Sequence, residues 1–330
     1  MRCATRSILG EPVVGELLWV DRLTAEVPGP GRALDDVSFA MAAGETVAIV
    51  GESGSGKTLL GRLVADVAPT TVRVVTGDVH WRGQARSALS ARARRNHRGA
   101  DIAYIPQDIG TALDPSRRIG ASVVEGLRRV DRMRRGDASA RALELLRTAG
   151  FDTPEQFVRA YPHQVSLGQR QRALIATALA REPRLVVADE PTSALDAPVA
   201  AEVIETLRRI RNERDSALLL ITHDLGAVAA LADRVLVLYA GRIVETAPVS
   251  TFFRAPAHPY TRALLAARPE PGARPSALPG TAADIRALPS GCAFHPRCPN
   301  AVDSCTRNVP LPRELERGHV IACPIVEGAR

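Results

Sequence analysis

The sequence GESGSGKT, at residues 51–58, constrains the fold more than any other segment of the chain. It matches the pattern G-x-x-x-x-G-K-[ST], in which backbone N–H groups and one lysine surround phosphate oxygens. The apolar run before it, at residues 46–50, predicts a buried strand, and the apolar spacing after it predicts a helix. A strand, a phosphate loop and a helix in this order predict an α/β fold that binds a nucleotide.

Each residue type in this loop has a physical reason. Glycines let the backbone N–H groups turn inward, and the N-terminus of the following helix adds a partial positive charge. Lys57 is the only lysine in the sequence, and we expect its compact ammonium to reach the β- and γ-phosphates while Thr58 ligates Mg²⁺. The residues expected to bind the nucleotide here are Gly51, Ser53, Gly54, Ser55, Gly56, Lys57 and Thr58.

Further short apolar runs are typical of strands of one sheet. They occur at residues 102–105, 185–190, 218–221 and 235–238, and helix-like segments such as 199–211 separate them. Alternating strands and helices predict a doubly wound parallel sheet.

Polar residues follow these runs, where the carboxyl ends of parallel strands meet the ligand. We expect Asp189 to hold Mg²⁺ through water and Glu190 to act as the general base that polarises the attacking water. Gln107 and His223 follow two other runs, and His223 is placed to hydrogen-bond a γ-phosphate. The predicted chemistry is hydrolysis of a nucleoside triphosphate.

These segments, together with VSLGQ at 165–169 and SALD at 193–196, resemble the ATP-binding subunit of an ATP-binding cassette (ABC) transporter. The resemblance covers about residues 15–330. It implies a P-loop NTPase (RecA-like) cassette with an antiparallel β subdomain and a helical subdomain. It also implies that Gln107 senses Mg²⁺ and the γ-phosphate, and that further nucleotide contacts come from Ser166, Gly168, Gln169 and Asp196.

The same resemblance implies partners. Two cassettes bind ATP head to tail, so a single cassette needs a second one, with residues 166–169 acting in trans. Ser166 and the N–H groups at the start of a helix predicted over 169–181 form the anion-binding end of this segment. Leu167 stands where the family has glycine, which favours a different partner chain over a second copy. Two transmembrane permease subunits and an extracytoplasmic substrate-binding protein complete the expected assembly, with this chain peripheral at the cytoplasmic face of the membrane. No apolar stretch approaches the roughly 18 residues that would span a bilayer.

The C-terminal part differs in composition. More than half of the 24 prolines lie from Pro248 onward, which argues against a regular sheet or a long helix there. The segment AHPYTRAL at 257–264 resembles a motif of oligopeptide and dipeptide importer cassettes, a subfamily that also includes nickel and some sugar importers. We therefore expect an N-terminal tail at 1–15, an ATPase domain at 16–248 with its helical subdomain at about 110–181, and a loop-rich extension at 249–330.

Four of the five cysteines lie in this extension: Cys292, Cys298, Cys305 and Cys323. Clustered thiols in a cytosolic protein suggest a soft metal, but their spacing matches neither the common zinc pattern nor the ferredoxin pattern. Some peptide-importer cassettes hold a [4Fe-4S] cluster with four such cysteines, and this resemblance implies the same here. Zinc and unligated thiols are the alternatives, with His295 and His319 as substitute ligands.

The charge of the chain suggests a competing function. The formal charge of +7 and the basic run 82–98 suggest a soluble ABC ATPase that acts on nucleic acid or the ribosome. Stacking aromatic residues are missing from this run, and such ATPases usually carry two cassettes, so no nucleic acid partner is expected.

The resemblance also implies an aromatic residue upstream of the phosphate loop, on which the adenine stacks. The sequence has no aromatic residue between Val20 and Ser38. Arg32, in this range, is either a stacking residue or a solvated one.

Overall fold

The computed structural model describes residues 16–29, 31–131, 133–214, 216–267 and 280–326, so the expected tail at 1–15 lies outside the described residues. The chain divides into two compact units. The phosphate-loop unit takes its described residues from 1–42, 47–89 and 232–330, and the helical unit takes them from 43–46 and 90–231.

The phosphate-loop unit contains the antiparallel sheet that the resemblance implies. β1 (Glu16–Glu26) pairs with both β2 (Arg32–Ala42) and β4 (Arg73–Trp81), and β5 (Gln84–Ala85) extends the sheet beyond β4. Most apolar side chains of β1 and β2 are buried, among them Leu18, Leu34 and Met41.

A second group of strands in this unit carries the phosphate loop. β3 (Thr46–Val50) is buried along its whole length, as five consecutive apolar or β-branched residues predict. It runs parallel to β9 (Arg234–Tyr239), and β10 (Arg242–Pro248) pairs antiparallel with β9. Helix α1 (Lys57–Val64) begins directly after the loop, so the predicted order of strand, loop and helix is confirmed.

The extension is more regular than its proline content predicts. β12 (His319–Ile321) pairs with β10, and β11 (Arg313–Glu316) pairs with β12, so two short strands of the extension continue the sheet. Both strands are free of proline, which is why they can form ladder hydrogen bonds. The helices of the extension are short: α10 (Val249–Arg254), α11 (Pro259–Ala266), the 3₁₀ turn η4 (His295–Arg297) and α12 (Asp303–Arg307).

The helical unit holds three parallel strands in the order β8-β7-β6. They are β6 (Ile102–Ile105), β7 (Leu185–Asp189) and β8 (Ala217–Ile221), so the strands predicted at 102–105, 185–190 and 218–221 are confirmed to within a residue. Their helices are α2 (Ala91–Ala100), α3 (Ile109–Ala112), α4 (Ile119–Asp131), α5 (Arg135–Thr148), α6 (Pro154–Phe157), α7 (Leu167–Ala178), α8 (Ala197–Arg214) and α9 (Leu225–Leu231), with 3₁₀ turns η2 (Pro162–Gln164) and η3 (Leu179–Arg181).

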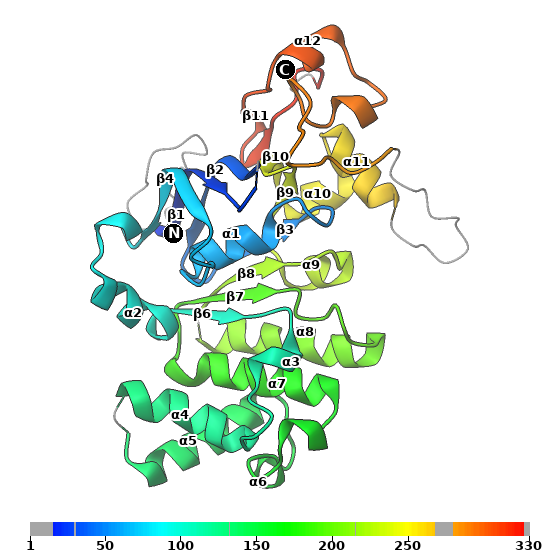
Figure 1. Cartoon of the computed structure of the whole chain (residues 1–330). Helices are drawn as coiled ribbons and strands as arrows, with labels where there is room; N and C mark the ends of the chain where they lie inside the picture. The colour runs from blue at the N-terminus through cyan, green and yellow to red at the C-terminus, as the bar shows by residue number, and fades with distance from the viewer. Residues whose placement is uncertain (1–15, 30, 132, 215, 268–279, 327–330) are drawn as a thin grey trace. The chain divides into compact units, whose positions relative to one another are not determined.

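Helices α4, α5 and α7 pack on one another and share one hydrophobic core, in the lower half of Figure 1. Apolar residues at helical spacing, such as Leu145 and Leu146 of α5 and Ile175 of α7, supply this core. No helix of the described residues is long and apolar enough to cross a membrane. The fold therefore places a phosphate loop in one unit and a bundle of helices beside three parallel strands in the other.

Candidate functional site

The phosphate loop depends on two glycines that could not carry a side chain. A Cβ at Gly51 would lie 2.1 Å from the carbonyl oxygen of Leu238, and a Cβ at Gly56 would lie 2.7 Å from the carbonyl oxygen of Ala33. Gly56 also has a φ of 102° as the N-cap of α1. The loop is thus held tightly against neighbouring backbone, as a phosphate cradle requires.

Lys57 folds back over this loop. Its Nζ donates hydrogen bonds of 2.8 Å to the carbonyl oxygens of Gly51 and Glu52, and the residue is 8% exposed. The carbonyl of Ser55 accepts a hydrogen bond from the N–H of Gly241, which fixes the middle of the loop. Thr58 follows in the first turn of α1, while Ser53 and Gly54 are exposed at the tip of the loop.

In the helical unit, Asp189 ends β7 and is fully buried. The hydroxyl of Tyr104, on β6, donates a hydrogen bond of 2.7 Å to its Oδ2. β6 and β7 are parallel neighbours, with Tyr104 opposite Val187, so the sheet itself brings this hydroxyl to the carboxylate. Sequence reasoning missed Tyr104, because only the pairing of two strands places it there.

Glu190 follows Asp189 in the left-handed region, with a φ of 49°. Such a backbone conformation is uncommon for a residue with a side chain and occurs often at functional sites. Its N–H donates to the carbonyl oxygen of Ile221, and its Oε2 lies 2.8 Å from Nδ1 of His223. Glu190 is 9% exposed and the His223 side chain is 66% exposed, so the pair joins a buried carboxylate to an accessible ring.

Two other predicted site residues lie at the ends of elements. Gln107 follows β6 and is exposed, and Asp108 next to it accepts a hydrogen bond from the N–H of Gly110 at the start of α3. Asp196 precedes α8, and its Oδ1 accepts a hydrogen bond of 3.1 Å from the N–H of Val199. Asp196 therefore caps α8.

The segment 166–169 forms the N-terminus of α7. The hydroxyl of Ser166 accepts a hydrogen bond from the N–H of Gln169, and Oε1 of Gln169 accepts one from the N–H of Ser166. This capping box starts α7 at Leu167, two residues before the predicted start. A Cβ at Gly168 would lie 2.1 Å from Cγ1 of Val199, so close packing against α8 requires this glycine. Leu167 is 38% exposed.

The predicted residues thus form two groups. Those of the phosphate loop lie together in the phosphate-loop unit, and the structure brings Glu190 and His223 together in the helical unit, where Asp189 is their neighbour along the chain. Arg32 lies 3.5 Å from the carboxylate of Asp35, so its guanidinium has an acidic partner. The basic run 82–98 spans the turn η1 and helix α2, where His97 pairs with Asp101 at 2.8 Å.

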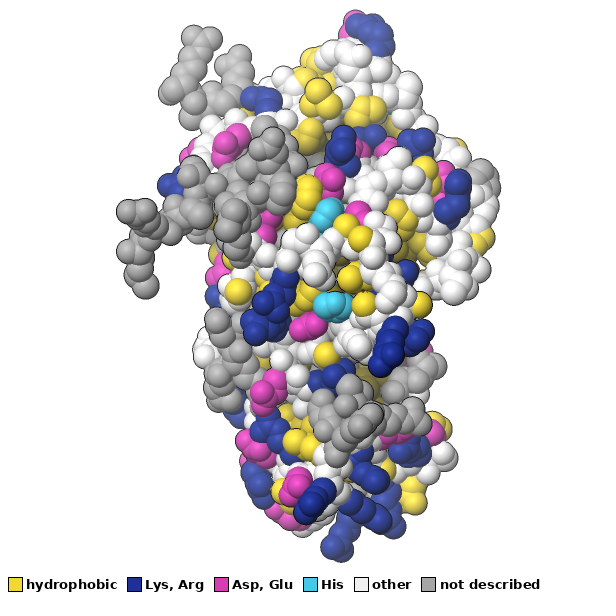
Figure 2. Space-filling model, turned by 90° about the vertical axis from the view of Figure 1, so that its left-hand side faces the viewer, with side chains coloured by type: hydrophobic (Ala, Val, Ile, Leu, Met, Phe, Trp, Pro, Cys, Tyr) yellow, Lys and Arg dark blue, Asp and Glu magenta, His cyan; other side chains and the backbone are white. Residues whose placement is uncertain are grey.

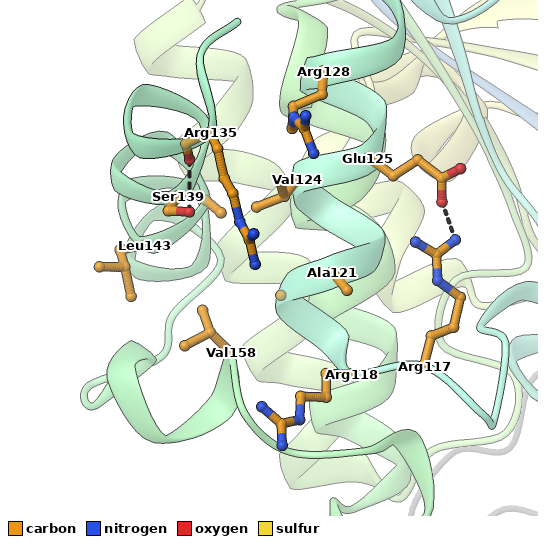
Figure 3. Close-up of a pocket in the computed structure, with 12 residues that line it drawn as sticks. Arg117, Arg118, Ala121, Val124, Glu125, Arg128, Arg135, Ser139, Leu143 and Val158 are labelled. Atoms are coloured by element: carbon orange, nitrogen blue, oxygen red, sulfur yellow. Dashed lines mark hydrogen bonds and ion pairs between the residues drawn. The ribbon is translucent and has the colours of Figure 1, made fainter.

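The helical unit also contains a cavity of about 780 Å³ between α4, α5 and α6. Figure 3 shows Arg118, Arg128 and Arg135 around it, while Arg117 pairs with Glu125. Val124 and Leu143 supply an apolar part of the wall. Arginine side chains also gather on the surface at the lower end of the molecule in Figure 2. The cavity is therefore basic and partly apolar.

The expectation of an iron–sulfur cluster is wrong. Among the described residues, which include Cys292, Cys298, Cys305 and Cys323, no group of three or more His, Cys, Asp or Glu residues is arranged to hold a metal ion. Burial raises the pKa of the Cys292, Cys298 and Cys323 thiols above its usual value. The thiolate is the form that binds metal, so this environment favours the protonated thiol.

The two substitute ligands have other partners. Nε2 of His319 lies 2.8 Å from Oε1 of the buried Glu245, and Nδ1 of His295 lies 2.9 Å from the carbonyl oxygen of Cys292. His319 therefore ties the extension to β10, and His295 holds a turn within the extension, each through a hydrogen bond.

Comparison with protein families gives three matches. The family described as ABC transporter matches residues 34–193, and the family described as oligopeptide/dipeptide transporter, C-terminal region, matches residues 244–305. A third, described as AAA domain, putative AbiEii toxin, Type IV TA system, matches residues 159–229.

Similar curated proteins cover nearly the whole chain. The dipeptide transport ATP-binding protein DppD of Escherichia coli (strain K12) is 39% identical over 93% of this chain and 96% of its own length. The probable peptide ABC transporter ATP-binding protein y4tR of Sinorhizobium fredii is 41% identical over 88% of this chain and 89% of its own length. The oligopeptide transport ATP-binding protein AppD of Bacillus subtilis is 38% identical over 90% of this chain and 92% of its own length.

Among solved structures, the ATP-binding cassette MJ0796, a dimer in a post-hydrolysis state bound to ADP and Pi, matches with a TM-score of 0.63 and 26% identity. The match covers 70% of this chain and 98% of that one. This likeness agrees with the phosphate loop, the parallel strands and the helical region described above. The chain belongs to the ATP-binding proteins of the ABC transporter family, in the branch with an oligopeptide/dipeptide transporter C-terminal region, and it is an ATPase that binds ATP.

Proposed function

We propose that this chain is the ATP-hydrolysing subunit of an importer for oligopeptides or dipeptides, bound to its permease at the cytoplasmic face of the membrane. The observation that carries the proposal is the match of residues 244–305 to the oligopeptide/dipeptide transporter C-terminal region. The named relatives, which transport dipeptides and oligopeptides, support the same cargo class. The division into an ATPase domain at 16–248 and an extension at 249–330 belongs to this proposal.

In the proposed reaction, water attacks the γ-phosphorus of ATP and the bond to the β-phosphate oxygen breaks, which gives ADP and phosphate. Glu190 accepts the proton of the attacking water, and His223, 2.8 Å from its carboxylate, orients Glu190 and the γ-phosphate. Lys57 and the loop N–H groups bind the β- and γ-phosphates. Lys57 donates to two loop carbonyls in this structure. Its side chain is flexible, so Nζ can turn its three donors toward a phosphate while the Cα stays in place.

The site suits a divalent cation as well. Each unit offers oxygen donors of the kind that Mg²⁺ prefers: the hydroxyl of Thr58 in the phosphate-loop unit, and the buried carboxylate of Asp189 and the amide oxygen of Gln107 in the helical unit. When bound, Mg²⁺ supplies positive charge that offsets the charge of the β- and γ-phosphates.

We assign Ser166, Gly168 and Gln169 to the ATP bound by a second cassette. The start of α7 presents N–H groups and a partial positive charge, and Ser166 and the neighbouring Leu167 are exposed there. Two identical chains would place Leu167 against both nucleotides, so a different chain is the better partner.

The basic cavity between α4 and α5 is our candidate site for a permease segment. Its arginines and apolar wall suit an amphipathic helix with acidic residues. Reversal of charge at Arg128 and Arg135 (Arg128→Glu with Arg135→Glu) should release the permease subunits in co-purification while leaving ATP binding unchanged.

The cargo is tested in cells that lack this chain. Uptake of a radiolabelled dipeptide should fall to background, and wild-type protein should restore it while Glu190→Gln should not. Labelled Ni²⁺ and a labelled sugar serve as parallel cargoes. Loss of nickel or sugar uptake with dipeptide uptake intact would overturn the peptide proposal and select the corresponding alternative.

A further inference from the structure

An ion pair joins the extension to the phosphate loop. Nη1 and Nη2 of Arg297, in the turn η4, donate hydrogen bonds of 2.7 and 2.9 Å to the two carboxylate oxygens of Glu52, the second residue of the loop. The Arg297 side chain is only 5% exposed and that of Glu52 is 21% exposed. Such a two-point pair fixes both the position and the plane of the carboxylate.

A second contact reaches the same loop residue. The N–H of Glu52 donates a hydrogen bond of 2.7 Å to the hydroxyl of Tyr260, in helix α11 of the extension. Tyr260 is fully buried, and its ring packs on Tyr239 and Phe294 at centroid distances of 4.6 and 5.3 Å. Packing therefore locks the hydroxyl in place, and burial raises the pKa of Tyr260 so that it stays protonated.

The arginine is positioned by the same aromatic cluster. Its guanidinium carbon lies 5.9 Å from the ring centroid of Tyr239 and 5.8 Å from that of Phe294, and Nη1 is 3.3 Å from the Tyr239 hydroxyl. Cation–π contacts with desolvated rings stabilise a buried guanidinium. The extension thus presents Arg297 and Tyr260 to the loop from one rigid surface.

Glu52 connects these contacts to the phosphate-binding lysine. Its carbonyl oxygen accepts hydrogen bonds from Nζ of Lys57 at 2.8 Å and from the N–H of Ser55 at 3.2 Å. Glu52 is therefore held through its side chain and its N–H by the extension, and through its carbonyl by the loop. A shift of Glu52 must move the donors that face the phosphates.

We infer that Arg297 and Tyr260 are positioning residues for nucleotide binding, and that the C-terminal extension sets the affinity of the phosphate loop for nucleotide. An acidic side chain in a phosphate-binding loop repels the negative charges of ATP and ADP. Arg297 offsets this charge and holds the carboxylate, while Tyr260 holds the backbone of Glu52. The inference requires nucleotide binding alone and is independent of the cargo.

Binding of MgADP to the purified full-length chain, measured by calorimetry, tests this inference. Arg297→Gln leaves the Glu52 carboxylate uncompensated and should raise the Kd for MgADP by roughly tenfold. Tyr260→Phe removes one hydroxyl and keeps the ring, so it should raise the Kd for MgADP by roughly threefold. The double variant Glu52→Gln with Arg297→Gln removes both charges and should return the Kd to within about twofold of wild type.

The control is Arg313→Gln in β11. Arg313 is an arginine of the same extension whose Nε donates to the carbonyl oxygen of Cys323, so its loss should leave the Kd unchanged. Circular dichroism and the thermal midpoint establish that each variant is folded.

Wild-type affinity in folded Arg297→Gln and Tyr260→Phe would overturn the inference, as would equal weakening by Arg313→Gln. Failure of the double variant to restore affinity would also overturn the charge argument. If Arg297→Gln does not fold, Tyr260→Phe and the double variant decide the question, because neither leaves the Glu52 carboxylate unpaired.

Discussion

The hydroxyl of Tyr104 donates a hydrogen bond of 2.7 Å to Oδ2 of Asp189, across two neighbouring parallel strands. Asp189 is fully buried at the end of β7, and a buried carboxylate is costly unless hydrogen bonds satisfy it. Tyr104 supplies one such bond and fixes the direction in which the carboxylate points. The strand pairing thus orients the carboxylate that we propose holds Mg²⁺.

Replacement of Tyr104 should change the Mg²⁺ requirement of the enzyme. In Tyr104→Phe the carboxylate loses a donor and its fixed direction, so the Mg²⁺ concentration for half-maximal ATP hydrolysis should rise by roughly twofold to tenfold. The measurement is a Mg²⁺ titration of the ATPase rate of the assembled complex at fixed ATP. An unchanged titration curve would show that the hydroxyl serves packing only.

Leu167 should slow the nucleotide site to which its segment contributes. Its branched side chain is exposed at the start of α7, where the family has a glycine that admits the γ-phosphate. Leu167→Gly should therefore raise the steady-state ATPase rate of the assembled complex by at least about twofold. Leu167→Ala, which keeps the Cβ, is the matched control and should give a smaller gain. An unchanged rate in Leu167→Gly contradicts this expectation.

The stability of the chain should fall in mild acid because of His258. Burial lowers the pKa of His258 to about 4, and its Nδ1 accepts a hydrogen bond from the N–H of Tyr260. The unfolded chain binds this proton near pH 6.5 and the folded chain only near pH 4, so stability falls as pH decreases through that window. Across the whole window, the free energy of unfolding falls by about 3 kcal/mol.

Glu245 acts in the same direction at lower pH. Burial raises its pKa, but hydrogen bonds from His319 and from the N–H groups of Ala257 and His258 outweigh burial, so the net pKa is lowered. The contribution of Glu245 to stability is present above the ordinary glutamate pKa and is lost as pH falls through the lower folded value.

Urea unfolding of wild type and His258→Asn between pH 7.5 and 4.5 tests whether His258 causes the loss of stability in mild acid. The variant should lose most of the pH dependence above pH 5, and equal slopes would contradict it.

The extension thiols should react slowly at neutral pH. Burial raises the pKa of Cys292, Cys298 and Cys323, so the reactive thiolate is scarce near pH 7. Modification by iodoacetamide, followed by mass spectrometry of the full-length chain, should accelerate steadily from pH 7 to pH 10. Rapid labelling of these three residues at pH 7 would contradict the raised pKa values.

Local patterns explain what could be predicted. The strands β3, β6, β7 and β8 are short apolar runs next to polar residues, so their bounds and the place of Lys57, Asp189 and Glu190 follow from neighbouring residues. The start of α7 was misplaced by two residues because the capping box of Ser166 and Gln169 was overlooked.

Contacts between distant residues could not be predicted. Glu52 and Arg297 are 245 positions apart, and nothing near either residue indicates the other. The same holds for Tyr104 and Asp189, 85 positions apart. The cluster expected at Cys292, Cys298, Cys305 and Cys323 is wrong for a related reason: metal ligands must be brought together by the fold, and the spacing of cysteines along the chain does not report whether the described residues are so arranged.

We propose that ATP hydrolysis at Glu190 drives peptide import. Reconstitution of the permease, both cassettes and the peptide-loaded binding protein in proteoliposomes, with either wild-type chain or Glu190→Gln, tests this proposal. Wild type should hydrolyse ATP and accumulate labelled peptide, and Glu190→Gln should bind ATP normally while the hydrolysis rate at this site falls by roughly 10²- to 10⁴-fold and uptake stops. Peptide uptake at the wild-type rate by the Glu190→Gln complex would contradict the claim.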